Sequence, residues 1–487
     1  AAGLVIGLVP GAALPPLEPE LVFLVFLPPI LWSAAYGTSF RDFRANLEPI
    51  ALLSVGLVLV TTVAVAFAAR ALMPGMPWAV AIALGAIVSP PDAIAAEAII
   101  RRLPVPRRVI SVLAGESLVN DASALVLYRT AIAAAVTGFF SPGEAVVRFF
   151  VDAGIGTLIG LFVGWLVVRT ILLTRDPVAE VLIGLIGPYV AWVAGESLHV
   201  SSVLACVSGG LYMRQHFSTA VAPTTRIQSQ AVWELFTFLL NAAIFILLGV
   251  QFGRLMEMVP AGTLARVVAA GFAISGVAIA VRLVWVPASL AVPRWIFGRG
   301  ERDKLPPARG MFLVGWTSMR GIVSLAAALG LPVALANGAP FPYRSEIILI
   351  TLCVIVVTLV LQGLTLAPLI RRLRFPPDTA LEREERFARG EALRHGLEIL
   401  DDLSGEPWAA AADVERLRNE LRDRLQRHRD GVGGQYDAEC RLRREVLSAE
   451  RRELVRLRNE NAISDDVLAD LEQELDLEAL RIGAGRS

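Results

Sequence analysis

Long apolar runs separated by short polar stretches occupy the first three quarters of the chain. A helix that crosses a bilayer needs about 20 mostly apolar residues, and eleven full runs and one partial run approach or reach that length. They cover 1–14 (partial), 18–36, 47–70, 77–100, 108–137, 148–174, 178–196, 200–215, 230–252, 262–292, 309–335 and 345–371. This pattern predicts an all-α membrane protein with many spans.

Basic residues alternate between the loops that join these runs. The basic loops carry Arg41 and Arg44; Arg101, Arg102, Arg107 and Arg108; Arg169 and Arg175; Arg214 and Arg226; Arg294, Arg299, Arg302, Lys304 and Arg309; and Arg371, Arg372 and Arg374. The loops between them carry at most one Arg. Because basic loops are retained in the cytoplasm, we expect these loops and the C-terminal tail to be cytoplasmic.

Charge separates the C-terminal tail from the rest of the chain. Residues 376–487 hold 19 Arg and 27 acids, a net of −8, whereas residues 1–375 hold 26 Lys and Arg and 18 acids, a net of +8. We therefore expect a transmembrane domain over 1–375 and a tail over 376–487, with helices at about 379–402, 407–429, 436–461 and 465–480. Mixed charges at helical spacing favour a solvated helix face; a surface that binds a partner or supports a dimer is the alternative.

A few charged residues lie deep within the apolar runs, where each costs about 2.5–3.5 kcal/mol and is usually functional. They are Asp92, Glu116, Asp121, Glu234, Arg282 and Arg320. Ser117 and Asp121 share one helix face, and Glu116 and Asn120 share the neighbouring face, so the two acids lie roughly 140° apart. We expect one acid to face an ion path and the other to be neutralised, with Arg282 the most deeply placed partner.

Two runs are interrupted near their middle. Pro90 and Pro91 break the run at 77–100, since proline removes a backbone donor and clashes with the preceding turn, and Asp92 follows directly. The segment around Arg320, with Ser318 and Gly321 expected to support a second break, interrupts the run at 309–335. Paired interruptions indicate an inverted-repeat transporter with its site between them. A proline kink capped by an acid and ordinary small-residue packing are the alternatives.

Five motifs occur in order along residues 1–375: "SPPDA", "GESLVNDASALV", "FILLGVQF", "RLVWV" and "MRGIVSLAAALGLP". Together they resemble the monovalent cation:proton antiporters of the NhaP and NHE type, in particular bacterial members with a cytoplasmic C-terminal extension. The resemblance implies thirteen helices in two inverted repeats, with two crossed, unwound helices and usually a homodimer. It also implies that the first helix and part of the second are missing from this chain.

The resemblance also assigns roles to the charged residues. Asp121 is implied to carry a proton and a cation, Na⁺ first, in alternation, with Asn120 and Ser117 nearby. Glu116 and Arg282 match the buried ion pair of the family. The unwound part of the site matches Ser89, Pro91 and Asp92. Two departures, Ser33 in "LPPILWSA" and Pro91 where the family has threonine, each remove an oxygen ligand, so K⁺ stays open as the cation.

These observations predict a secondary transporter that exchanges Na⁺ for H⁺, one for one, by alternating access in the plasma (inner) membrane and serves pH homeostasis. A K⁺/H⁺ antiporter of the same fold is the first alternative and a cation channel the second. A membrane enzyme is disfavoured because the runs lack paired catalytic His or Cys and zinc-ligand spacing. We expect no cofactor and no nucleic acid; the partners are the cation, the proton, the bilayer and a second copy. No phosphate loop marks a ligand in the tail.

Overall fold

In a computed structural model of the chain, the described residues form helices joined by turns and loops. The described residues are 19–92, 96, 99–100, 103–138, 142–174, 176–221, 223–258, 261–297, 308–335, 338–376, 379–430, 433–460 and 464–483. Within these ranges the β-structure is confined to an isolated bridge between Ala334 and Pro340. The chain divides into two compact units, Ala1–Pro377 and Asp378–Ser487. The partial run predicted at 1–14 lies outside the described residues.

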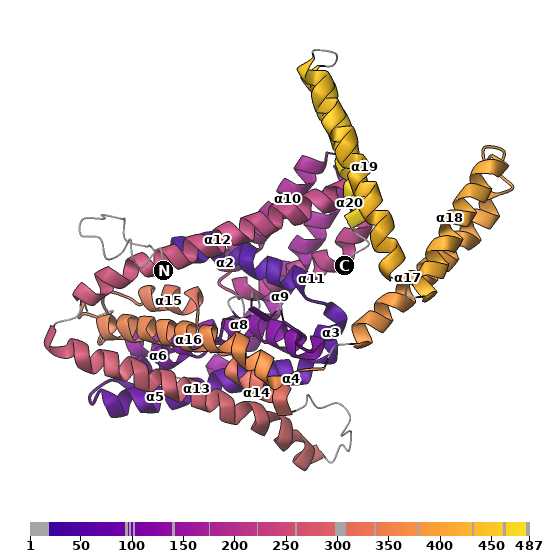
Figure 1. Ribbon diagram of the computed structural model, residues 1–487. Helices are drawn as coiled ribbons and strands as arrows, with labels where there is room; N and C mark the ends of the chain where they lie inside the picture. Colours follow the sequence, from indigo (N-terminus) through magenta and orange to yellow (C-terminus); the bar gives the residue numbers. More distant parts are fainter. Residues whose placement is uncertain are drawn as a thin grey trace. The chain divides into compact units, whose positions relative to one another are not determined.

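The first unit contains fifteen helical segments among its described residues, and Figure 1 labels its α-helices. The segments are α2 (Pro19–Gly37), α3 (Phe40–Ala45), α4 (Leu47–Ala51), the π-helix η1 (Leu52–Leu57), α5 (Val58–Leu72), α6 (Trp78–Val88), α8 (Arg107–Thr137), α9 (Pro142–Leu173), α10 (Pro177–Ser197), α11 (Ser202–Ala220), α12 (Pro223–Met258), α13 (Ala261–Phe297), α14 (Ala308–Trp316), α15 (Ile322–Leu329) and α16 (Arg344–Leu373).

Six helices among the described residues are long and apolar enough to cross a membrane by length and composition. They cover Leu47–Leu72, Arg107–Thr137, Val147–Leu173, Pro177–Ser197, Leu264–Ser289 and Arg344–Leu373. Two shorter apolar helices, Phe23–Gly37 and Trp78–Val88, accompany them. The expectation of an all-α, multi-span membrane protein is confirmed.

Two broken helices occupy matching places in the two halves of the first unit. In the first half α5 is followed by α6, which ends at Val88, and residues 89–92 are not helical before the long α8. In the second half α13 is followed by α14, residues 317–321 are not helical, and α15 leads to the long α16. The sequence of long, broken and long helix thus occurs twice.

The helix that the run at 47–70 forms, Leu47–Leu72, contains a π-helical turn, η1, between α4 and α5. The indole Nε1 of Trp285, on α13, donates to the carbonyl of Leu52 at 3.0 Å. A Cβ on Gly56 would lie 2.8 Å from the same ring, so glycine is needed for this close approach. A π-helical turn is a common response to a side chain that takes a backbone carbonyl out of the α-helical ladder.

Helix α8 lies between two apolar clusters. One cluster joins α5, α6, α13, α15 and α16, and it includes Tyr128 of α8. The other joins α2, α9, α10 and α11, and it includes Leu118 and Ala122 of α8. The helix with "GESLVND" therefore forms part of the boundary between two packed bodies.

Three of the basic loops meet at one end of the first unit. Arg107 forms an ion pair with Asp42 at 3.0 Å, which joins the loops at 38–46 and 103–106. Val105 and Phe375 are buried in the same apolar cluster, so the end of α16 lies there as well. This grouping agrees with the alternation of basic loops in the sequence.

The second unit consists of paired, charged helices. They are α17 (Thr379–Leu403), α18 (Ala411–Asp430), α19 (Gly433–Asn459) and α20 (Asp465–Gly483). Arg418 of α18 binds Asp401 of α17 at 2.7 Å, and Arg451 of α19 binds Asp476 of α20. The second helix begins at Ala411 rather than near 407, because residues 404–408 form turns around Gly405 and Pro407.

A substitution at Gly85 tests how closely α6 packs against α5. A Cβ at Gly85 would overlap the backbone of Thr62, whereas a Cβ at Gly276 of α13 meets nothing within 4 Å. Overpacking costs about 1–3 kcal/mol, and glycine inside a helix costs about 1 kcal/mol relative to alanine. We expect Gly85→Ala to lower the thermal midpoint of unfolding in detergent and Gly276→Ala to keep or raise it. Equal midpoints would contradict this packing.

Candidate ion-binding site

The two helix breaks cross each other. The backbone N–H of Asp92, after the first break, donates to the carbonyl of Met319, in the second, at 2.6 Å. A Cβ on Gly321 would overlap the carboxylate of Asp92, so that side chain lies directly against the second break. Glycine at 321 is therefore a requirement of the crossing.

Arg320 joins the two breaks through its buried guanidinium group. Its Nε donates to the carbonyl of Val88, the last residue of α6, at 2.9 Å, and its Nη1 bonds the carbonyl and hydroxyl of Ser318. Its backbone N–H donates to Thr358 Oγ1 of α16 at 3.1 Å. A positive charge is favoured at a helix C-terminus, so Arg320 stabilises the end of the half-helix α6.

Glu116 and Arg282 form a bidentate ion pair that is almost completely buried. Arg282 Nη2 lies 2.7 Å from Glu116 Oε2, and Nη1 bonds Oε1. The remaining Nε of Arg282 donates to the carbonyl of Val314 in α14 at 3.0 Å. Because both carboxylate oxygens are occupied by the guanidinium, Glu116 is not available as an ion carrier.

Asn120 connects α8 to the first break and presents an unused oxygen. Its Nδ2 donates to the carbonyl of Pro91 at 2.8 Å. Its Oδ1 is buried and has no hydrogen-bond partner in the described part of the chain. A buried polar atom is almost always paired, so this oxygen is available to accept a hydrogen bond or to coordinate a cation.

Asp121 follows Asn120 and points away from the Glu116 pair. It is buried, at 8% exposure, and no hydrogen bond or ion pair to its carboxylate joins it to the residues that the structure describes. The negative charge of Asp92 acts on it directly. Burying a carboxylate without a compensating charge costs free energy. Binding a proton or a cation would neutralise the carboxylate and remove this cost.

The other predicted ligands differ in what they offer. Ser117 lies one turn before Asp121 on the same helix and is partly buried. Ser89 is buried, but its hydroxyl donates to the carbonyl of Ala86 at 3.1 Å, so it offers only the remaining lone pairs of its oxygen. Pro91 contributes a carbonyl that already accepts from Asn120. The structure thus gathers carboxylate, amide and carbonyl oxygens around the crossing.

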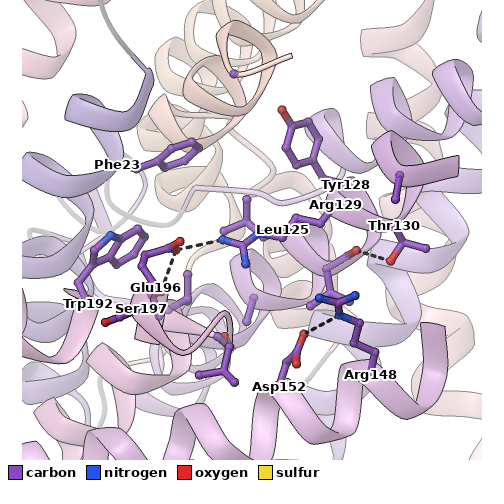
Figure 2. A pocket seen from close by; sticks show the side chains of 18 of the residues that line it. Phe23, Leu125, Tyr128, Arg129, Thr130, Arg148, Asp152, Trp192, Glu196 and Ser197 are labelled. Atoms are coloured by element: carbon purple, nitrogen blue, oxygen red, sulfur yellow. Dashed lines mark hydrogen bonds and ion pairs between the residues drawn. The ribbon is translucent and has the colours of Figure 1, made fainter. Parts of the chain in front are cut away.

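A cavity of about 1160 Å³ leads toward this region between α8 and the second apolar cluster. Figure 2 shows Arg129 of α8 reaching Glu196 of α10 across it, at 3.0 Å. Arg148 and Asp152 of α9 form a second ion pair in its wall, at 3.7 Å. The cavity lining includes Ala122, the residue next to Asp121, so it approaches the carboxylate from the end of the unit where α8 ends.

The sequence analysis did not identify the polar face of α16. Thr358 binds the backbone of Arg320, and Thr365 Oγ1 accepts from Trp316 Nε1 at 3.0 Å. Gln362, between them, is fully buried. The signal was present as polar residues spaced i, i+4 and i+7 within the apolar run at 345–371.

The site is suited to a hard, weakly held cation rather than to a resident transition metal. Among the described residues, no three His, Cys, Asp or Glu side chains could hold a metal ion together. Hard cations prefer oxygen ligands, and oxygen atoms are what the crossing provides. A hard cation at the crossing would therefore be a transported substrate, not a resident cofactor.

Arg282→Met should destabilise the protein by about 3–5 kcal/mol, because it leaves Glu116 buried and unpaired. Arg129→Met is the matched control, since it removes an exposed pair of the kind worth about 0–1 kcal/mol. Thermal unfolding of purified protein measures both, and Glu116→Gln combined with Arg282→Met should recover part of the loss. Arg282→Met with parental stability would contradict the role given to the pair.

Comparison with known proteins agrees with this geometry. Residues 1–372 match the family described as "Sodium/hydrogen exchanger, transmembrane". An uncharacterized Na⁺/H⁺ exchanger of Mycobacterium tuberculosis is 36% identical, over 99% of this chain and 90% of its own length. The "sodium, potassium, lithium and rubidium/H⁺ antiporter" of Bacillus pumilus is 30% identical, over 97% of this chain and 72% of its own length.

The fold is similar to a solved structure as well. The sodium proton antiporter MjNhaP1 from Methanocaldococcus jannaschii matches with a TM-score of 0.58 and 17% identity, over 76% of this chain and 91% of that one. This likeness confirms the predicted antiporter fold with its two interrupted helices. The family assignment also confirms that the protein is a transporter and not an enzyme. The chain belongs to the sodium/hydrogen exchanger family and is an integral membrane cation/proton antiporter.

Proposed function

We propose that this antiporter exchanges Na⁺ for H⁺ one for one by alternating access, with Asp121 as the group that carries either ion. The observation that supports this most directly is the buried carboxylate of Asp121, which no described residue neutralises, beside the unpaired Oδ1 of Asn120. A proton or a cation can neutralise this carboxylate, but the two compete for the same oxygens.

The charges at the crossing favour a single exchanged charge. Arg282 neutralises Glu116, whereas no described residue neutralises the buried carboxylate of Asp121. One positive charge, from a proton or a monovalent cation, restores neutrality in each half of the cycle. This balance supports electroneutral exchange.

Alternating access is supported by the position of α8. The lining of the cavity in Figure 2 runs along α8 from Ala122 to Thr137, near the end of that helix, and α8 borders both apolar clusters. Sliding of one cluster against the other would close this cavity and open another. A channel, in contrast, needs no titrating group and would not couple the two ions.

Potassium is the second candidate for the cation. The Bacillus pumilus relative is named for sodium, potassium, lithium and rubidium, which supports a broad choice of cation in this chain also. Ser33 and Pro91 stand where other members have oxygen ligands, and fewer fixed ligands discriminate less between cations of different size.

We also propose that the protein is a homodimer in the plasma membrane, that its tail is cytoplasmic, and that it serves pH homeostasis.

Asp121→Asn should abolish exchange in proteoliposomes, measured as proton flux driven by an inward Na⁺ or K⁺ gradient. Glu234→Gln is the matched control, because Glu234 lies in an apolar run but is exposed and bonded to Gln230. The control should exchange at the parental rate. If Asp121→Asn also does so, the carrier assignment is wrong, and if a pH gradient fails to drive uphill cation flux, the protein is not an antiporter.

Exchange should carry no net charge. We expect proteoliposomes on a solid-supported membrane to show a change in internal pH when Na⁺ is added, without a transient current. A current that scales with the rate of pH change would contradict the one-for-one stoichiometry, since it would require more than one charge on one side of the exchange.

A further inference from the structure

Gln362 is a fully buried amide on α16 that makes no hydrogen bond. Neither its Nε2 nor its Oε1 has a hydrogen-bond partner among the residues that the structure describes. An unpaired buried amide lowers stability, and within a membrane water is scarce as a substitute. A methionine of similar volume would fill the same space without this cost. A role in packing alone therefore does not account for glutamine at this position.

The amide faces the second helix break. Thr358, Gln362 and Thr365 lie on one face of α16, because they are spaced by four and three residues. Thr358 Oγ1 accepts the backbone N–H of Arg320 at 3.1 Å, and Thr365 Oγ1 accepts the indole N–H of Trp316 at 3.0 Å. Gln362 lies between these two contacts and is directed at the unwound segment that they bracket.

The unwound segment has unpaired groups of its own. Neither Ser318 nor Met319 donates its backbone N–H to a residue that the structure describes. A Cβ on Gly363, next to Gln362, would lie 3.9 Å from Met319 Sδ, so the segment is close. The Gln362 amide, which has no partner among the described residues, thus lies near the N–H groups of Ser318 and Met319, which have no acceptor among those residues.

We propose that Gln362 is a positioning residue of the transport cycle: its amide bonds the unwound segment 317–321 in a state other than the present one. Through that bond it sets the position of the Met319 carbonyl, which holds the backbone of Asp92 beside Asp121. The bond between Gln362 and the segment 317–321 is absent in the present state. It therefore stabilises the other state of the cycle relative to this one. This inference rests on the proposed alternating access.

Gln362→Met tests the proposal through two measurements that move differently. The thermal midpoint in detergent should stay the same or rise, because an unpaired amide is removed. The maximal exchange rate at saturating cation should fall about tenfold, as expected for one hydrogen bond made in only part of the cycle. Thr351→Val is the matched control, since it removes another fully buried, unpaired polar atom from α16, and it should exchange at the parental rate.

Three results would overturn the proposal. In the first, Gln362→Met exchanges at the parental rate. In the second, Gln362→Met loses stability or fails to fold, which would assign glutamine a structural role. In the third, Thr351→Val loses exchange rate equally, which would assign the effect to the helix as a whole. Asp121→Asn measured alongside separates this inference from the proposed function. Exchange by Asp121→Asn would refute the carrier, whereas parental exchange by Gln362→Met with an inactive Asp121→Asn refutes only the role of Gln362.

Discussion

Breaking a helix inside a membrane leaves backbone groups without their intrahelical partners, and water is not there to replace them. The site in this antiporter depends on how those groups are paired. Arg320 takes the carbonyl at the end of α6, and Arg282 takes the carbonyl of Val314 in α14. The breaks then bind each other directly, through the N–H of Asp92 and the carbonyl of Met319. Without these contacts the half-helices would not hold oxygen atoms at a common point.

The two arginines that donate hydrogen bonds to these carbonyls, Arg282 and Arg320, each place a positive charge in the buried interior. Glu116 neutralises Arg282 through a bidentate pair, and Arg320 donates to the carbonyls of Val88 and Ser318. We propose that the buried carboxylate of Asp121, which no described residue neutralises, accepts either a proton or a monovalent cation.

The sequence indicated much of this arrangement for identifiable reasons. Consecutive prolines predicted the first break, and helical spacing separated Glu116 from Asp121, because both effects act within a few residues. The π-helical turn at Leu52 could not be predicted, since it depends on the indole of Trp285, which is far away in the sequence. The role of Gln362 was missed for a related reason. Its spacing from Thr358 and Thr365 is visible, but what that face meets depends on how α14 packs. Ser89 stays a predicted ligand; that its hydroxyl donates to its own helix could not be known from the sequence.

The central claim is that one carboxylate holds a proton or a cation, but not both. Proton release on cation binding tests this most directly. Na⁺ or K⁺ would be added to purified protein in weak buffer, and the protons released would be compared with the cations bound. We expect one proton to be released for each cation bound at a pH where Asp121 is protonated, and none from Asp121→Asn. Cation binding without proton release, or equal release from Asp121→Asn, would contradict it.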